Sequence, residues 1–305
     1  MIKIMKNTSA QDIAAFLDDQ REQQGAGVLG RVLTLLVCVP GMIDVGTARE
    51  ICSAASREHP CRVIIVVEGG IEANTNLLNA EIRTGESAGA SEVIVLEPKG
   101  EVANNLDTLV MPLLLSDVPI VVYWPFTAPK VPSAHPLGRM ATKRITDVRS
   151  GQHPVTTLRH LASVYSPGDN DLAWSAITLW RALLSSIMDQ CDGADIETAL
   201  ISGNLHHPAP TLTRAWLESY GIECKLEHVE NAATISGVRF FFSCGEETAL
   251  SRPEQSRIAE LTRTGKPATL VKLARRTPQD CLMEELRRFD PDEYYATVLE
   301  LLKES

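Results

Sequence analysis

The sequence "RVLTLLVCV" (residues 31–39) is a nearly continuous apolar run rich in β-branched residues, and "CRVIIVVE" (residues 61–68) repeats the pattern farther along the chain. Runs of this kind are typical of strands that are buried on both faces. Pro40 and Gly41 end the first run, and "DVGTAREICSAASREH" (residues 44–59) has the pattern of a helix. A strand, a helix and a strand in so short a span form a βαβ unit with parallel strands. The stretch therefore predicts an α/β fold built on a parallel sheet.

The rest of the first half extends this sheet on both sides. We expect a helix at 9–22 that begins at Ser9 or Asp12 and buries a stripe with Ile13, Phe16 and Leu17. Further strands are expected at 77–85, 91–98, 118–125 and 143–148, with helical turns near 102–114. Together these elements predict an N-terminal, mostly parallel α/β sandwich over residues 1–152.

The second half has a different pattern. A helix is expected at 154–165, and a second helix within 166–190 is expected to be capped by Asp169, Asn170 or Asp171. A strand, a helix and a strand follow at 196–203, 210–221 and 223–229. Short β-rich pieces then alternate with turns from 235 to 273, which favours an antiparallel meander. Two helices, at 277–289 and 290–304, close the chain. We therefore predict a C-terminal α/β domain over residues 153–305, with an antiparallel β-rich part and terminal helices.

Composition narrows the class of protein. The chain has 305 residues, of which 44% are hydrophobic and 22% charged, and its net charge is −10. An acidic surface disfavours binding to nucleic acid or to an anionic membrane. No stretch approaches the ~20 apolar residues of a membrane span, and the first residues lack the apolar core of a signal peptide. We expect a cytoplasmic protein.

One glycine-rich stretch invites a cofactor interpretation. "GAGVLG" (residues 25–30) reads as the G-x-G-x-x-G pattern of dinucleotide-binding loops. That pattern requires a strand before it and a helix after it, whereas here a helix precedes and a strand follows. We therefore expect a turn into the first buried strand, and no bound cofactor.

The chain also lacks a recognisable catalytic or metal-binding motif. The seven cysteines are scattered without a C-x-x-C pair, and the adjacent histidines 206 and 207 have no third metal ligand nearby. His59 and Cys61 could form a nucleophilic pair, but Pro60 between them favours the end of a helix and the start of a buried strand. We predict no catalytic and no metal-binding residues, and hence no enzyme. A thiol sensor that uses Cys61 or Cys281 remains an alternative.

Aromatic and basic residues supply the candidates for a binding surface. "FTAPKVPSAHPLG" (residues 126–138) follows a buried strand at the edge where open α/β sheets usually bind ligands. Trp and Arg are enriched in interface hot spots, and Trp174 lies far around a helix from Trp180, which we expect in the core together with Leu183, Leu184 and Ile187. We predict a partner-binding surface that includes Trp124, Phe126, Arg139, Asp171, Trp174 and Arg181.

A different function remains open for the same region. Arg139, Lys143 and Arg144 give the edge at residues 124–144 a positive charge that suits an anionic ligand. The alternative is therefore a sugar-phosphate-binding α/β enzyme or regulator that uses this loop.

Several long blocks resemble one known family. They are "GRVLTLLV", "ASREHPCRVIIV", "SEVIVL", "MPLLLSDVPIVVYWP", "PLGRMATKRITD", "YSPGDNDLAWSAITLWRALLSS" and "DCLMEELRRFDPDEYYATVL", in order from about residue 28 to 300. The chain thereby resembles the OpcA family, the glucose-6-phosphate dehydrogenase assembly proteins of actinobacteria and cyanobacteria. The resemblance implies a non-catalytic partner and allosteric activator that binds this dehydrogenase and promotes its oligomerisation and activity in the oxidative pentose phosphate pathway. Some cyanobacterial members are redox-controlled through cysteines, but no cysteine pair here matches theirs.

Overall fold

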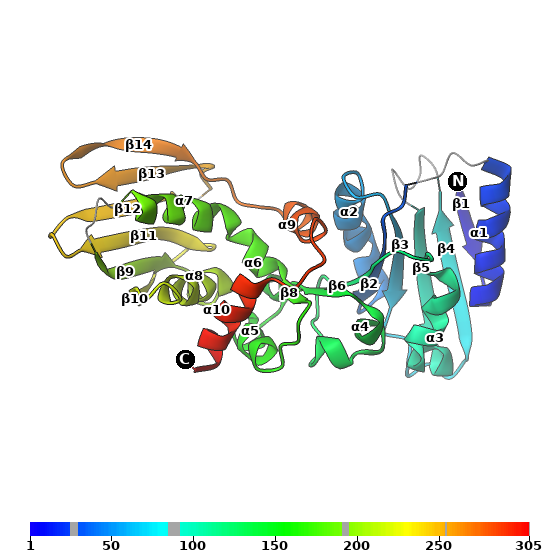
Figure 1. The fold of residues 1–305 in the computed structure, drawn as a ribbon. Helices are drawn as coiled ribbons and strands as arrows, with labels where there is room; N and C mark the ends of the chain where they lie inside the picture. Colours follow the sequence, from blue (N-terminus) through cyan, green and yellow to red (C-terminus); the bar gives the residue numbers. More distant parts are fainter. Residues whose placement is uncertain (25–29, 85–91, 191–194, 254, 305) are drawn as a thin grey trace. The chain divides into compact units, whose positions relative to one another are not determined.

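The computed structural model describes residues 1–24, 30–84, 92–190, 195–253 and 255–304 (Figure 1). The chain divides into two compact units, and each is described by itself. Unit 1 comprises residues 1–147, 166–170 and 278–291, and unit 2 comprises residues 148–165, 171–277 and 292–305. The sequence-based boundary at 152 lies close to the main division at 147, but two later segments belong to unit 1. The α/β class predicted for both halves is confirmed.

Unit 1 is built on a mixed sheet with the strand order β1-β4-β5-β3-β2-β6-β7-β8. The predicted βαβ unit is present, because β2 and β3 run parallel to each other. Parallel pairing continues from β2 to β6, from β6 to β7 and from β3 to β5, whereas β4 and β1 form an antiparallel edge. The strands are β1 (Ile2–Met5), β2 (Leu33–Val39), β3 (Cys61–Val67), β4 (Leu77–Arg83), β5 (Glu92–Lys99), β6 (Ile120–Trp124), β7 (Lys143–Thr146) and β8 (Asp169–Asp171).

Helices cover both faces of this sheet (Figure 1). On one face, α1 (Ala10–Gln24), α3 (Leu106–Val110) and α4 (Pro136–Met140) bury alternate strand residues such as Leu36, Ile64 and Val122. On the other face, α2 (Val45–Ala55) packs against β2, β3 and α9 (Pro278–Glu285). Every residue of β2 and β3 is buried, which is why both strands read as continuous apolar runs.

Local signals set the helix boundaries in unit 1. The Ser9 Oγ accepts a hydrogen bond from the Asp12 amide at 3.1 Å, and the Asp12 carboxylate accepts one from the Ser9 amide at 3.2 Å. This reciprocal capping box fixes the start of α1, so both predicted capping residues take part. The predicted helical region near 102–114 consists of α3 flanked by two short 3-10 turns, Gly100–Asn104 and Met111–Leu113.

Unit 2 combines a six-stranded sheet with five helices among the residues that the structure describes (Figure 1). The predicted second βαβ unit is confirmed, since β9 and β10 are parallel and α8 connects them. The predicted meander is also confirmed, with antiparallel pairing from β9 through β14. The strands are β9 (Ile196–Gly203), β10 (Glu223–His228), β11 (Ile235–Phe242), β12 (Glu247–Ser251), β13 (Ile258–Arg263) and β14 (Lys266–Lys272), and the helices are α5 (Pro154–Ser163), α6 (Leu172–Ala176), α7 (Thr178–Asp189), α8 (Pro208–Glu218) and α10 (Glu293–Glu304).

The sequence-based interpretation of residues 166–190 as one helix is wrong. The segment begins with β8, continues as α6, and turns at Ile177 into α7. The Asp171 carboxylate caps α6 by accepting a hydrogen bond from the Ala173 amide at 2.8 Å. Asp171 was one of three predicted caps, but the short strand before it carries no periodic signal.

Candidate functional site

A small pocket opens at the carboxyl edge of the sheet in unit 1. The parallel strands run in the order β5-β3-β2-β6-β7, so the direction of winding reverses between β2 and β6. Open α/β sheets bind their ligands at this kind of switch point. The pocket has a volume of about 260 Å³ and is lined by residues at or just after the carboxyl ends of β2, β3 and β6, namely Cys38, Pro40, Glu68, Gly69, Trp124, Thr127, Ala128 and Pro129.

Polar groups in this pocket and next to it lie close to the Glu68 carboxylate. The His135 Nδ1 accepts a hydrogen bond from the Leu137 amide at 3.3 Å and so caps α4. The His135 Nε2 lies 3.0 Å from the Glu68 Oε1 without the alignment of a hydrogen bond. The imidazole also meets the Trp124 ring edge to face, with a centroid distance of 5.3 Å. Burial, and then the Glu68 carboxylate that accepts its hydrogen bond, raise the pKa of the Cys38 thiol well above its usual value.

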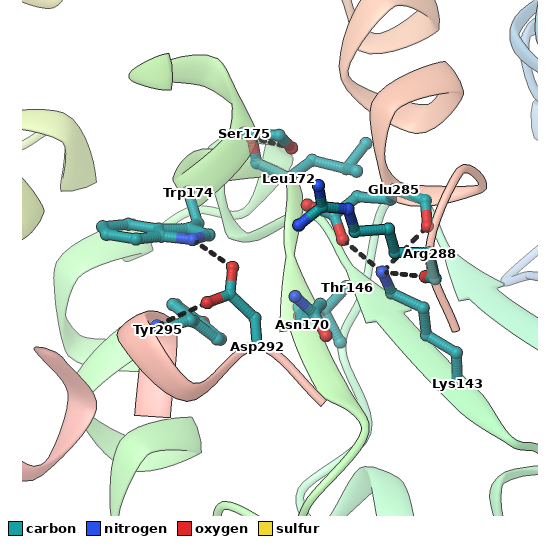
Figure 2. Close-up of polar contacts among 10 residues, drawn as sticks. All are labelled: Lys143, Thr146, Asn170, Leu172, Trp174, Ser175, Glu285, Arg288, Asp292 and Tyr295. Atoms are coloured by element: carbon teal, nitrogen blue, oxygen red, sulfur yellow. Dashed lines mark hydrogen bonds and ion pairs between the residues drawn. The ribbon is translucent and has the colours of Figure 1, made fainter. Parts of the chain in front are cut away.

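The cations predicted to face an anionic ligand are engaged elsewhere within unit 1, which corrects that expectation. The Lys143 Nζ lies 2.7 Å from the Glu285 Oε2 and donates hydrogen bonds to the carbonyls of Glu285 and Arg288 (Figure 2). The Arg144 guanidinium pairs with Asp169 and also donates to the Pro167 carbonyl. Burial raises the pKa of Asp169, against the lowering effect of Arg144. Arg139 is the exposed member of the three, 3.7 Å from the Asp107 carboxylate.

In unit 2, Trp174 lies in the interior rather than on the surface. It is 1% exposed, and its indole Nε1 donates a hydrogen bond to the Asp292 Oδ2 at 2.8 Å (Figure 2). The Arg181 guanidinium stacks over the indole at 3.6 Å from the ring centroid. The other Asp292 oxygen accepts from the Tyr295 amide at 2.9 Å and so caps α10. The indole therefore ties α6 to the start of α10.

The six residues predicted for partner binding thus divide into two groups. Trp124, Asp171 and Trp174 are buried. Phe126 and Arg181 are partly exposed, and Arg139 is exposed. The structure brings Trp174 together with Arg181 through the stacking contact. Trp180, Leu184 and Ile187, predicted as core, are buried as expected, whereas Leu183 is partly exposed.

The thiol and histidine candidates have structural roles. Cys61 and Cys281 are both buried, which excludes them as accessible thiol sensors. Cys61 starts β3, as the interpretation of residues 56–63 predicted. The His207 Nδ1 caps α8 by accepting from the Ala209 amide at 3.1 Å, and burial, with the charges of Arg149 and Arg275, lowers its pKa to about 4.

The described residues offer neither a metal-binding cluster nor a membrane-spanning helix. No group of three or more His, Cys, Asp or Glu side chains in this part of the chain is arranged to hold a metal ion. None of the helices described here combines the length and apolar character needed to cross a membrane. Within "GAGVLG", residues 25–29 lie outside the described residues, while Gly30 has a positive φ of 128° at the approach to β2.

The sheet of unit 2 has one buried face and one open face. The buried face includes Ile201, Val238, Phe240 and Leu250, and α8 packs against β9 and β10. The residues that alternate with them are exposed or partly exposed. We call this second side the open face. Pairing places its residues in rows across the strands, of which one is Glu227, Ser202, Gly237, Ser251, Glu260 and Leu270.

A shallow hollow lies in the open face. It has a volume of about 460 Å³. The hollow exists because four of its lining residues, in neighbouring strands, are small: Ser202, Gly237, Ala249 and Ser251. The Ser202 Oγ donates to the Glu227 carboxylate at 2.6 Å along one wall. The Arg239 side chain is 53% exposed and lies 3.6 Å from Glu247.

Sequence reasoning missed three residues that organise these regions: Glu68, His135 and Asp292. A signal existed for two of them. Glu68 is the first charged residue after a buried strand, at the edge where sites form. His135 precedes a proline at the start of a helix, as does His207, and both cap through Nδ1. Asp292 is far from Trp174 in sequence, so only the tertiary structure brings them together.

Comparisons with known proteins agree with this architecture. Residues 52–163 match the family model described as the glucose-6-phosphate dehydrogenase subunit N-terminal domain. Residues 167–299 match the model described as the C-terminal domain of the same subunit. A comparison with curated proteins gave no match. Because the two models follow each other and cover most of the chain, this protein belongs to the OpcA family of glucose-6-phosphate dehydrogenase assembly proteins.

Proposed function

We propose that this chain is a non-catalytic protein that binds glucose-6-phosphate dehydrogenase and promotes its oligomerisation and activity. The observation that carries the proposal is the succession of both dehydrogenase-subunit domains over residues 52–299. A protein of this kind acts through its surface, so the proposal also needs a surface large enough to bind a partner.

The open face of unit 2 supports this requirement. Six strands about 4.8 Å apart and about 20 Å long present a surface on the order of 600 Å². A standard protein interface buries about 800 Å² on each partner, so the open face could supply most of one side. Its charges are mixed, with Lys225 and Arg239 beside Glu227 and Glu247. Such a pattern favours a partner with matching charges over a uniformly charged polymer.

A second part of the proposed contact surface comes from the sequence-based candidates. Phe126, Arg139 and Arg181 retain exposure and are proposed as direct contacts. Trp124, Asp171 and Trp174 are buried, so we propose that they act by supporting the elements that carry the contacts.

The test of the function is reconstitution with the dehydrogenase of the same host. We expect the two proteins to co-purify, the mass of the dehydrogenase assembly to increase in light scattering, and its activity to rise. The comparison is the dehydrogenase alone at the same concentration. Unchanged mass and unchanged activity would refute the proposal.

Two substitutions locate the surface. Ser251→Arg places a long cationic side chain in the hollow of the open face, at an exposed position. Its matched control is Ser243→Arg, at an exposed position beyond the end of β11. We expect Ser251→Arg to weaken binding at least tenfold, about 1.4 kcal/mol, while Ser243→Arg binds as the wild type does.

The loop of unit 1 is tested separately by Phe126→Ala. If this variant loses binding and Ser251→Arg does not, the contact lies on the loop and the open face is excluded. If neither variant changes binding, both surfaces are wrong even where reconstitution succeeds.

A further inference from the structure

The switch-point pocket of unit 1 contains buried polar atoms that lack partners. The Trp124 side chain is 1% exposed, and its indole Nε1 has no hydrogen-bond partner among the described residues. The Glu68 Oε1 is buried 3.0 Å from the His135 Nε2, but it accepts no aligned hydrogen bond in the described part of the chain. A buried donor or acceptor left unsatisfied costs about 1–3 kcal/mol, and native proteins rarely retain one without a reason. Here the donor and the acceptor belong to two residues that line one pocket.

The two atoms define the ligand chemistry. The indole N–H requires an acceptor, and the carboxylate oxygen requires a donor. A hydroxyl group offers both. The remaining walls are largely apolar and include Pro40, Ala128 and Pro129, which suit the C–H face of a small ring.

The charge of the pocket excludes an anion. Among the described lining residues, Glu68 carries the charge, and it is negative. Lys143 and Arg144 are held in buried ion pairs with Glu285 and Asp169. A phosphate group would therefore meet the Glu68 carboxylate, and the described lining residues include no Lys or Arg to balance the added charge. The volume of about 260 Å³ is also below the usual range for drug-sized ligands.

We propose that this pocket binds a small uncharged polyhydroxylated molecule, such as an unphosphorylated sugar or cyclic polyol. Its hydroxyl groups accept a hydrogen bond from the Trp124 Nε1 and donate one to the Glu68 Oε1. This site is separate from the proposed binding of the dehydrogenase, and its test requires only the chain itself.

The indole signal of Trp124 provides a direct test. The full chain contains four tryptophans, so ¹⁵N labelling gives four indole N–H signals, and Trp124→Phe identifies the one from the pocket. Glucose, ribose and myo-inositol are titrated as uncharged probes, and glucose 6-phosphate as the charged comparison. We expect at least one uncharged probe to shift the Trp124 signal and to leave the signals of Trp174, Trp180 and Trp216 in place. Glucose 6-phosphate should bind more weakly than glucose.

A matched pair of variants tests the role of Glu68. Glu68→Met keeps the length of the side chain and removes its acceptors, so affinity for the probe should fall roughly tenfold. Glu72→Met changes an exposed residue nearby and should leave affinity unchanged. In Glu68→Met, unchanged indole signals of Trp174, Trp180 and Trp216 would show that the variant is folded and that the loss of affinity is local.

Three results would overturn the proposal. The first is a Trp124 signal that no uncharged probe moves. The second is tighter binding of glucose 6-phosphate than of glucose, which would assign the pocket to anions. The third is equal affinity of Glu68→Met and the wild type, which would remove the carboxylate from the site.

Discussion

The buried ion pair between Lys143 and Glu285 allows a stability prediction with a worked magnitude. Lys143 is 3% exposed and Glu285 is 6% exposed. The Nζ lies 2.7 Å from the Glu285 Oε2, 2.8 Å from the Glu285 carbonyl and 3.0 Å from the Arg288 carbonyl. Lys143→Met keeps most of the buried volume but leaves the carboxylate without its ammonium partner. Removing one member of a buried pair costs about 3–5 kcal/mol.

A double variant separates the charge effect from the lost hydrogen bonds. Lys143→Met with Glu285→Met removes both charges and leaves the two carbonyls without the lysine donor, which costs roughly 1–3 kcal/mol. We therefore expect the double variant to be about 2 kcal/mol more stable than the single variant, the difference between these two ranges.

Urea unfolding followed by circular dichroism measures the change. Hydrogen exchange of peptides from β7 and α9 then assigns it to unit 1, where both residues lie. A double variant as unstable as Lys143→Met, or less stable, would refute the reasoning, because an unpaired charge could not then be the main cost.

Three further changes test other parts of the chain. Trp174→Phe removes the 2.8 Å hydrogen bond to the Asp292 carboxylate, so the free energy of unfolding should fall by about 2 kcal/mol; an unchanged urea midpoint contradicts this. His207 has a folded pKa of about 4, below the unfolded value of about 6.5, so its stabilisation is complete above pH 6.5 and is lost as the pH falls toward 4. His207→Asn keeps a helix cap without titrating, and its unfolding midpoint should decline less than that of the wild type over this range; equal declines would exclude His207 as the cause. Ser9→Ala removes the N-cap of α1 and should lower the protection of its first amides from hydrogen exchange by about 1 kcal/mol, with no effect in unit 2; unchanged protection means that the cap is dispensable.

The elements that the sequence predicted best are those with a strong local pattern. β2 and β3 are buried along their full length, and every position except Thr34 and Arg62 is apolar, so the pattern predicts buried strands clearly. The antiparallel strands of unit 2 were also predicted, because a strand with one buried and one open face alternates apolar and polar residues. The short strands β1 and β8 were missed, since three or four residues cannot show a period.

The candidate site was less predictable than the fold. A pocket does lie at the carboxyl edge of the sheet, which the order of strands and loops determines. The side chains of the pocket were not predicted. Glu68 lines it, and His135 lies 3.0 Å from Glu68. The alternative function placed Lys143 and Arg144 near an anionic ligand, but both form buried ion pairs, with Glu285 and Asp169. Their charge is visible in the sequence, whereas their partners are not.

The α/β class, the βαβ units and the family could all be inferred from the residues alone, because they depend on local periodicity and on long blocks of residues in a fixed order. Only the tertiary structure decided which polar groups are satisfied. Trp174 contacts Asp292 from a distant part of the chain, while the Trp124 indole nitrogen lies in a pocket without a hydrogen-bond partner among the residues that the structure describes. Both are tryptophans in apolar surroundings, and nothing in their local sequence distinguishes them. The difference arises because hydrogen-bond satisfaction depends on which residues the fold brings within about 3 Å of each other.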